Sequence, residues 1–108
     1  MDTHLKHFLA LMHELQKIDS DFPLHYAICM VEISANEGLS LTELSLKTGL
    51  SLSTVSRIVG ALSDSRQKGQ PYNLVTVMIS KQEKRRKEIF LTEKGKTLIN
   101  SISSIMAA

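Results

Sequence analysis

The stretch LSLSTVSRIVGAL, residues 50–62, decides the fold of this 108-residue chain. Its apolar residues recur at steps of three and four, which predicts an amphipathic helix. The opposite face is unusual, because solvated helix faces normally carry many Lys and Glu, whereas this one holds a single long side chain, Arg57. The apolar stripe is Leu52, Val55, Ile58, Val59 and Leu62; the opposite face is Ser53, Thr54, Ser56, Arg57, Gly60 and Ala61. A face of such short side chains lets another surface approach the helix closely.

The residues just before this helix predict a second, shorter helix that is joined to it by a tight turn. Ser40 and Glu43 of SLTE can form a capping box, which opens a helix over 41–47. Gly49 can take the left-handed backbone conformation that ends this helix, and Ser51 can cap the next one. Because so short a connection makes the two helices cross steeply, the pair is predicted to be a helix-turn-helix.

The N-terminal third predicts two helices separated by the segment DSDFP, residues 19–23. Helical spacing of apolar residues places the first over 3–18 and the second over 22–36. We expect Asp21 to cap the second helix and Gly38 to end it. The core-facing residues of the second helix are expected to be Leu24, Ala27, Ile28 and Val31, with Met30 beside them.

A β-hairpin and a last helix are predicted after the helix-turn-helix. Residues 74–79 and 88–91 alternate between apolar and polar and are rich in β-branched side chains, which predicts two strands. The charged segment KQEKRRK, 81–87, connects them, and a helix follows over 93–106. The extended segment at Leu39 can add a short third strand to this hairpin.

This order of elements is a winged helix-turn-helix, a mainly α fold with a small β-hairpin wing and helices flanking it at both ends. We expect one domain over 1–108, with a winged-helix core at 22–92 between an N-terminal segment, 1–20, and a C-terminal segment, 93–108. The first helix has a larger apolar face than docking on a small core requires, which favours a role in dimerisation over packing within one chain. The expected dimerisation residues are Leu5, Phe8, Leu9, Met12, Leu15, Ile99 and Ile102.

Composition and charge narrow the class of function. Residues 1–56 hold three Lys and seven acids, whereas 57–108 hold ten Lys and Arg and four acids, a balance of +6. A polyanion is therefore attracted to the second half of the chain. A single cysteine excludes an internal disulfide and suits a reducing cytosol. No signal-peptide pattern begins the chain, and no apolar run reaches the ~20 residues of a membrane span, so we expect a cytoplasmic protein without a membrane partner.

Double-stranded DNA is the partner that explains both the short-residue helix face and the cationic hairpin. A recognition helix enters a major groove about 12 Å wide, where Ser and Thr can bond bases or phosphates and Arg favours guanine. An Arg at the hairpin tip suits a narrow minor groove, and the other cations suit phosphates. The expected DNA-binding residues are Ser51, Ser53, Thr54, Ser56, Arg57, Lys81, Lys84, Arg85, Arg86 and Lys87.

At these residues the chain resembles the MarR-type winged-helix regulators of bacteria. The clearest marks are TVSR at 54–57 and LTEKG at 91–95. That family commonly has an acidic residue and an arginine at the wing tip, and counting back from the second motif places them at Glu83 and Arg85. The resemblance covers about residues 24–106 and implies a homodimeric DNA-binding transcriptional regulator, most simply a repressor that occupies a promoter.

Three departures from the family's pattern are visible. Glu83 stands where the family usually has Asp, and the loop at 66–72 is longer and more polar than the usual tight turn. Family members also typically carry a further long C-terminal helix, whereas this sequence ends at Ala108. The two flanking segments are then left to dimerise alone, or the protein uses another mode, or it is a monomer. The family's usual effector pocket lies between the dimer and DNA-binding regions, so the altered dimer region leaves the effector unknown.

The alternative to a DNA reader is a protein-binding adaptor or inhibitor on the same scaffold, which docks on another transcription factor or on polymerase. The short-residue helix face disfavours it, because protein interfaces use aromatic anchors and this face has none. Enzymatic activity is not expected, because no nucleophile–base pair or phosphate-binding glycine loop is present. No cofactor is expected either.

The cysteine and the histidines are expected to have structural or surface roles. Cys29 falls on or near the buried stripe of its helix, and no Lys or Arg lies within ten residues of it, so a packed thiol is favoured over a redox sensor. His4 and His7 have an i, i+3 spacing that a metal site can use. Neither cysteine nor a carboxylate cluster accompanies them, so no metal is expected.

Overall fold

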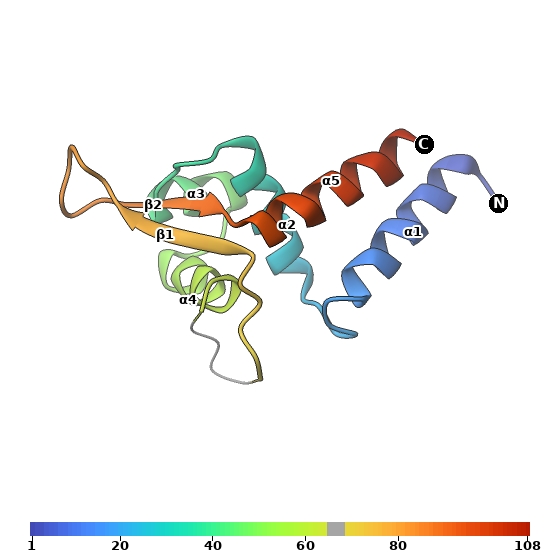
Figure 1. Ribbon diagram of the computed structural model, residues 1–108, viewed down its shortest axis with the longest axis horizontal. Coiled ribbons are helices and arrows are strands. Elements are labelled where there is room, and N and C mark those ends of the chain that lie inside the picture. The colour runs from blue at the N-terminus through green and yellow to red at the C-terminus, as the bar shows by residue number, and fades with distance from the viewer. Residues whose placement is uncertain (65–68) are drawn as a thin grey trace.

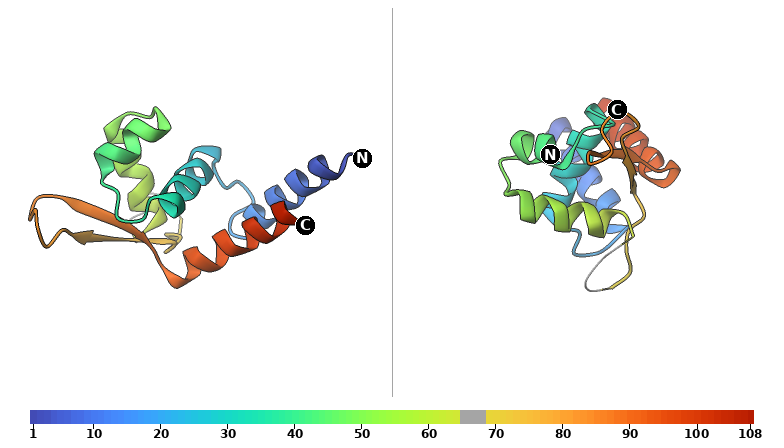
Figure 2. Two further views of the ribbon diagram at one scale, coloured as in Figure 1. Left: turned by 90° about the horizontal axis from the view of Figure 1, so that it is seen from above. Right: turned by 90° about the vertical axis from the view of Figure 1, so that its left-hand side faces the viewer.

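The computed structural model describes residues 1–64 and 69–108 and confirms the predicted order of elements (Figure 1). The molecule is elongated, with extents of 50 × 28 × 26 Å. The hairpin lies at one end, and α1 lies beside α5 at the other (Figure 2). The elements are α1 (Thr3–Gln16), α2 (Leu24–Ala35), α3 (Leu41–Thr48), α4 (Leu52–Leu62), β1 (Val75–Ile79), β2 (Lys87–Leu91) and α5 (Glu93–Ala107). Residues 66–68 of the predicted loop at 66–72 lie outside the described residues.

The local signals that define the helix-turn-helix are confirmed. The Ser40 hydroxyl accepts from the amide of Glu43 at 3.1 Å, while the Glu43 carboxylate accepts from the amide of Ser40 at 2.9 Å. Gly49 ends α3 at φ 75°, a left-handed conformation that L side chains rarely adopt. Ser51 then caps α4 by accepting from the amide of Thr54 at 3.2 Å. These short-range bonds fix where α3 stops and α4 starts, and so fix the turn between them.

The core lies where α2, α3 and α4 meet the hairpin. Ile89 of β2 is fully buried there, and the chain between α2 and α3 pairs with it as a single antiparallel bridge. The amide of Gly38 donates to Ile89 at 2.7 Å, and the amide of Ile89 donates to Leu39 at 3.0 Å. The predicted third strand is therefore present as this one bridge. The fully buried side chains are Met30, Ile33, Leu44, Ile58, Leu62, Leu74, Ile89, Val55 and Cys29.

The predicted core face of α2 was wrong at three positions, although Met30 is buried as predicted. Leu24, Ile28 and Val31 are 74%, 40% and 50% exposed, whereas Met30 and Ile33 are buried with Cys29. The reason is that α2 is apolar on nearly every side, so helical spacing alone does not determine which side faces the core. The consequence is an apolar stripe of α2 that its own chain leaves uncovered.

The start of α2 also differs from the prediction. Asp21 does not cap the helix; the N-cap position is held by Pro23, which has no side-chain cap bond. Residues 19–23 form a turn of their own instead, in which the amide of Asp21 donates to the carboxylate of Asp19 at 3.0 Å. The carbonyl of Pro23 accepts the first helical bond, from Tyr26 at 3.0 Å.

The predicted faces of α4 need two corrections. Leu52 is half exposed although it was assigned to the apolar stripe, and Ala61 is buried although it was assigned to the outer face. Leu52 is the first residue of α4 and lies beyond the edge of the core. Ala61 is in the last turn, where its carbonyl accepts from the amide of Tyr72 at 3.1 Å. The returning chain therefore covers the end of α4 and leaves its beginning open.

The hairpin reaches well beyond the core. β1 and β2 are antiparallel, with Val75 opposite Leu91 and Ile79 opposite Lys87. Val75 is buried at the near end, whereas Ile79 is mostly exposed at the far end. The pairing continues one step further, because the amide of Ser80 donates to the carbonyl of Arg86 at 2.8 Å. The outer half of the wing is thus held mainly by its own backbone bonds.

The LTEKG motif contains a glycine because α5 begins very close to the chain that enters β1. Thr92 caps α5 by accepting from the amide of Gly95 at 3.0 Å, and its own amide donates to the carbonyl of Leu74 at 3.0 Å. A Cβ built on Gly95 would overlap the carbonyl oxygen of Leu74. Gly95 therefore allows α5 to dock against the base of the hairpin.

We expect Gly95→Ala to lower the free energy of unfolding by about 1–3 kcal/mol, because the added methyl group must push two backbone segments apart. Urea denaturation measures this loss. The control is Ser103→Ala in the same helix, where an exposed position favours alanine and stability should stay constant or rise slightly. If Gly95→Ala is as stable as the wild type, the close approach of α5 is not a constraint on the fold.

Candidate nucleic-acid interface

The open face of α4 carries a cluster of hydroxyl groups at the N-terminal end of the helix. Ser51, Ser53 and Ser56 are exposed, and Thr54 is partly exposed. The Ser51 hydroxyl donates to the Thr54 hydroxyl at 2.8 Å and lies 3.2 Å from that of Ser53. Arg57 is exposed one step further along the helix. Since the buried side of α4 points into the core at Val55, Ile58 and Leu62, these polar side chains face outward.

The wing tip presents four of its five cationic side chains to solvent. Lys81, Lys84, Arg85 and Lys87 are all exposed. The turn is ordered by Ser80, whose hydroxyl accepts from the amides of Gln82 and Glu83, both at 3.2 Å. The cations are thus displayed on a hairpin of defined shape.

A groove of about 970 Å³ joins the wing to the start of α4. Ser53 and Ser56 line it from α4, and Arg85 and Lys87 line it from the wing. Leu52 contributes an apolar part of its wall. Arg86 also lines the groove, so the structure brings together five of the ten predicted site residues here. The predicted residues outside its lining are Ser51, Thr54, Arg57, Lys81 and Lys84.

Arg86 is the wing cation that is not free. Its guanidinium bonds the carboxylate of Glu43 at the start of α3, and its Nε lies 3.8 Å from a carboxylate oxygen of Glu88. The pKa of Glu43 is lowered, first by the hydrogen bond from the amide of Ser40 and then by the Arg86 side chain. The Glu43 carboxylate is therefore ionised at neutral pH and bridges α3 to the wing.

Sequence reasoning assigned Glu43 to helix capping alone and so missed this bridge. Glu43 and Thr42 both line the groove between α3, α4 and the wing. The two members of the ion pair are 43 residues apart, and neither helical nor strand periodicity connects positions at that separation. Only the folded hairpin brings them together.

Comparisons with solved structures identify the fold. The chain aligns with the MepR–DNA complex of S. aureus at 20% identity and a TM-score of 0.76, over 95% of this chain and 79% of that one. It aligns with the transcriptional repressor CouR bound to a 23-mer DNA duplex at 19% identity and a TM-score of 0.69, over 96% of this chain and 67% of that one. The MarR family transcription regulator SP03579 aligns at 14% identity and a TM-score of 0.70, over 89% of this chain and 58% of that one. The chain has the fold of a MarR family transcription regulator.

Sequence comparison adds a local match within this MarR-type fold. The IclR helix-turn-helix domain model matches residues 33–66, which include all of α3 and α4. Comparison with curated proteins found no match. The helix-turn-helix is thus the part with a recognisable sequence signature, whereas the MarR-type arrangement of wing and flanking helices is recognised from the structure.

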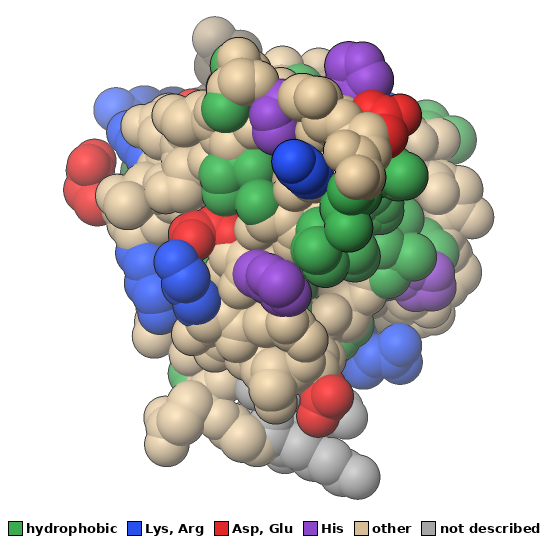
Figure 3. All heavy atoms as spheres, turned by 90° about the vertical axis from the view of Figure 1, so that its right-hand side faces the viewer, with side chains coloured by type: hydrophobic (Ala, Val, Ile, Leu, Met, Phe, Trp, Pro, Cys, Tyr) green, Lys and Arg blue, Asp and Glu red, His purple; other side chains and the backbone are tan. Residues whose placement is uncertain are grey.

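The end of the MarR-type fold opposite the wing is apolar. α1 contains no buried residue, and Leu5, Phe8, Leu9 and Met12 are all substantially exposed. Figure 3 shows hydrophobic side chains gathered on this end of the molecule, with histidines around them. The remaining predicted dimerisation residues, Leu15, Ile99 and Ile102, pack partly buried against the core of their own chain.

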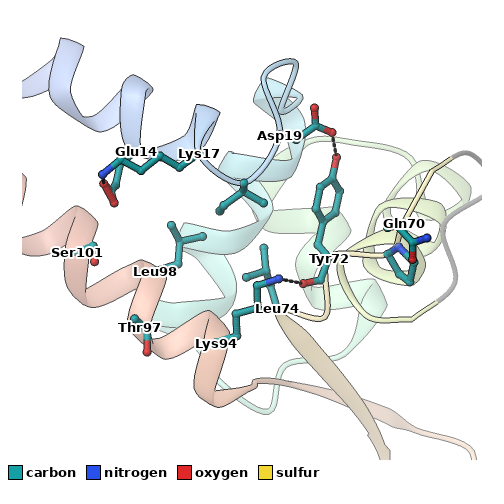
Figure 4. Close-up of a pocket in the computed structure, with 12 residues that line it drawn as sticks. Glu14, Lys17, Asp19, Gln70, Tyr72, Leu74, Lys94, Thr97, Leu98 and Ser101 are labelled. Carbon is teal, nitrogen blue, oxygen red and sulfur yellow. Dashed lines mark hydrogen bonds and ion pairs between the residues drawn. The ribbon is translucent and has the colours of Figure 1, made fainter.

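A second hollow, of about 440 Å³, lies where α1 and α5 meet the segment that leads into β1 (Figure 4). Lys94 donates to the carbonyl of Tyr72 at 3.0 Å, and the Tyr72 hydroxyl donates to Asp19 at 2.7 Å. Lys17 forms an ion pair with Glu14 at 2.6 Å. The bonds of Tyr72 with Lys94 and Asp19 tie α5 and the segment that follows α1 to the chain entering β1, whereas the Lys17–Glu14 pair lies at the end of α1.

Cys29 lies in the core of the MarR-type fold, and burial, with a smaller contribution from Glu32, raises the pKa of its thiol to about 11. The thiol is protonated at neutral pH and so lacks the thiolate that redox chemistry needs. Within residues 1–64 and 69–108, His, Cys, Asp and Glu side chains do not gather in groups that could hold a metal ion. In the same ranges, no helix has the length and apolar character required to cross a membrane.

Proposed function

We propose that this chain is a sequence-specific regulator of transcription that binds double-stranded DNA with α4 and the wing together. The observation that carries the proposal is the groove in which Ser53 and Ser56 of α4 lie opposite Arg85 of the wing. In this proposal the short side chains of α4 enter the major groove, and Arg85 enters the neighbouring minor groove. A surface of this kind fits a duplex, in which ridges and grooves alternate.

Charge supports the same proposal. The exposed cations Lys81, Lys84 and Lys87 extend along the wing, and the carboxylate of Glu83 is the acidic group among them. Cations of this kind contact phosphates without reading sequence, so they set affinity and its dependence on salt. The hydroxyl groups and Arg57 on α4 are then left to distinguish one base pair from another.

We further propose repression by occupation of a promoter and a homodimer formed through α1. CouR, which shares the fold, is a transcriptional repressor whose solved structure is bound to a 23-mer DNA duplex. The exposed residues Leu5, Phe8 and Met12 form an apolar face that water disfavours and a second copy can cover. α1 and α5 lie at the far end from the wing, so a dimer formed there leaves both recognition surfaces open (Figure 2).

Arg57→Ala tests the base-reading role of α4. We expect the variant to lose about 1–3 kcal/mol of binding free energy on the preferred duplex and to tolerate any base pair at one position of the site. Binding titrations against a panel of single-base-pair substitutions measure both effects. The control is Lys6→Ala on α1, which removes the same charge at the opposite end of the molecule and should leave the base preference unchanged.

An equal loss on every duplex would contradict the base-reading role of Arg57, because it would assign the residue to phosphates. A wild-type chain that binds all duplexes weakly and equally, but holds a protein partner tightly, would contradict the whole proposal and favour the adaptor function instead.

Phe8→Glu tests the proposed dimer. Because the Phe8 side chain is 47% exposed, the monomer should still fold, whereas a carboxylate on the apolar face should prevent association. Sedimentation equilibrium should give twice the 12.0 kDa chain mass for the wild type and the chain mass for the variant. Lys6→Glu adds a carboxylate to the same helix outside that face and should leave the dimer intact. Equal masses for Phe8→Glu and wild type would contradict this interface.

A further inference from the structure

The outer half of the wing has one side-chain connection to the helix-turn-helix. Beyond Val75, the residues of β1 are exposed, so apolar packing does not hold this part of the hairpin. Among the residues that the structure describes, the bond from Arg86 to Glu43 is the single side-chain hydrogen bond or ion pair between residues 80–87 and the helices. The placement of the outer half of the wing relative to α3 and α4 therefore depends on this contact.

Both members of the pair are held in place by their own surroundings. The Glu43 carboxylate is fixed by the amide of Ser40, because it is half of the capping box that starts α3. Arg86 is fixed through its backbone, since its carbonyl accepts from Ser80 and its amide donates to Glu83 at 2.8 Å. The contact thus joins the first turn of α3 to the residue that closes the wing turn.

The neighbours of Arg86 in the chain are the wing residues that face α4. Arg85 and Lys87 line the groove together with Ser53 and Ser56. Because Arg85 is the neighbour of Arg86 in the chain, the ion pair that holds Arg86 also limits the position of Arg85. It thereby sets the width of the groove between Arg85 and α4. We propose that Glu43 is a positioning residue that holds the wing, through Arg86, at the spacing required to read one duplex.

This inference rests on the proposed DNA-binding function and changes one part of it. Arg86 was expected to bind DNA, but its charge is committed to Glu43, a carboxylate that would otherwise repel phosphates from the groove. The pair is also well exposed, with 34% of the Arg86 and 46% of the Glu43 side chain accessible, and pairs of this kind add little to stability. Its effect is therefore on the placement of the wing.

Glu43→Gln separates the two roles of Glu43. Glutamine is accepted at the third position of a capping box, so α3 keeps its cap, but the charge that holds Arg86 is removed. Ser40→Ala is the matched control, because it removes the hydroxyl half of the box and leaves the Glu43 carboxylate in place. Arg86→Gln removes the other partner of the pair.

Two readouts are needed. Amide hydrogen exchange of Gln82, Glu83 and Arg86 in the free protein reports how firmly the wing turn is held. Titrations of a duplex selected by the wild type and of a random-sequence duplex, each over a range of salt concentrations, report specificity and the number of phosphate contacts.

We expect Glu43→Gln to speed exchange at the wing and to lower the ratio of specific to random-duplex affinity about tenfold, a change equal to about 1.4 kcal/mol. The released Arg86 should bind a phosphate and steepen the logarithmic salt slope by about 0.9. Arg86→Gln should lower the same ratio with an unchanged slope. Ser40→Ala should leave the affinity ratio unchanged.

The inference would be overturned if Glu43→Gln kept the wild-type ratio of specific to random-duplex affinity and the wild-type dependence of binding on salt. It would also be overturned by a slope reduced by about 0.9 in Arg86→Gln with unchanged wing exchange, because Arg86 would then be a phosphate ligand. The proposed function fails in a different measurement, namely if the wild type does not distinguish its selected duplex from the random one. Hydrogen exchange in the free protein then still decides whether Glu43 holds the wing.

Discussion

Burial of the apolar stripe of α4 is the constraint on which the rest of this structure depends. Val55, Ile58 and Leu62 lie in the core, and this fixes the rotation of the helix about its axis. This rotation places Ser53, Ser56 and Arg57 on the opposite side of the helix, where they face outward. A polar face of short side chains is a poor surface for packing within the chain but a good one for entering a groove. The hydrophobic effect thus creates the proposed recognition surface indirectly.

The contacts that position the wing change from buried at its base to exposed at its tip. At its base, Ile89 is buried and bridged to Leu39, and the amide of Leu91 donates to the carboxylate of Glu37 at 2.8 Å. At its tip, the contact of Arg86 with Glu43 is polar and exposed. The base is therefore rigid by packing, whereas the tip is set by one charged pair.

The parts of the fold that could be predicted are those with local causes. The capping box at Ser40 and the left-handed turn at Gly49 depend on neighbouring residues, so the helix-turn-helix was predictable. The buried side of α2 was not, because Leu24, Ile28 and Val31 are as apolar as the residues that the core selects. The ion pair that orients the wing was also beyond prediction, since it joins residues far apart in the chain. The restraint on Arg86 thus required the folded chain, and the DNA-binding roles of the site residues stay predictions.

The central claim is that α4 and the wing read one duplex together, and selection from a pool of random duplexes tests it most directly. The account predicts one enriched motif that carries a guanine contact for Arg57 beside a narrow, A·T-rich minor groove for Arg85. For a two-fold dimer, the motif should occur as inverted half-sites about 10 bp apart or a multiple of that. A pool that stays random after repeated rounds of binding, under conditions in which the protein is folded, would contradict the account.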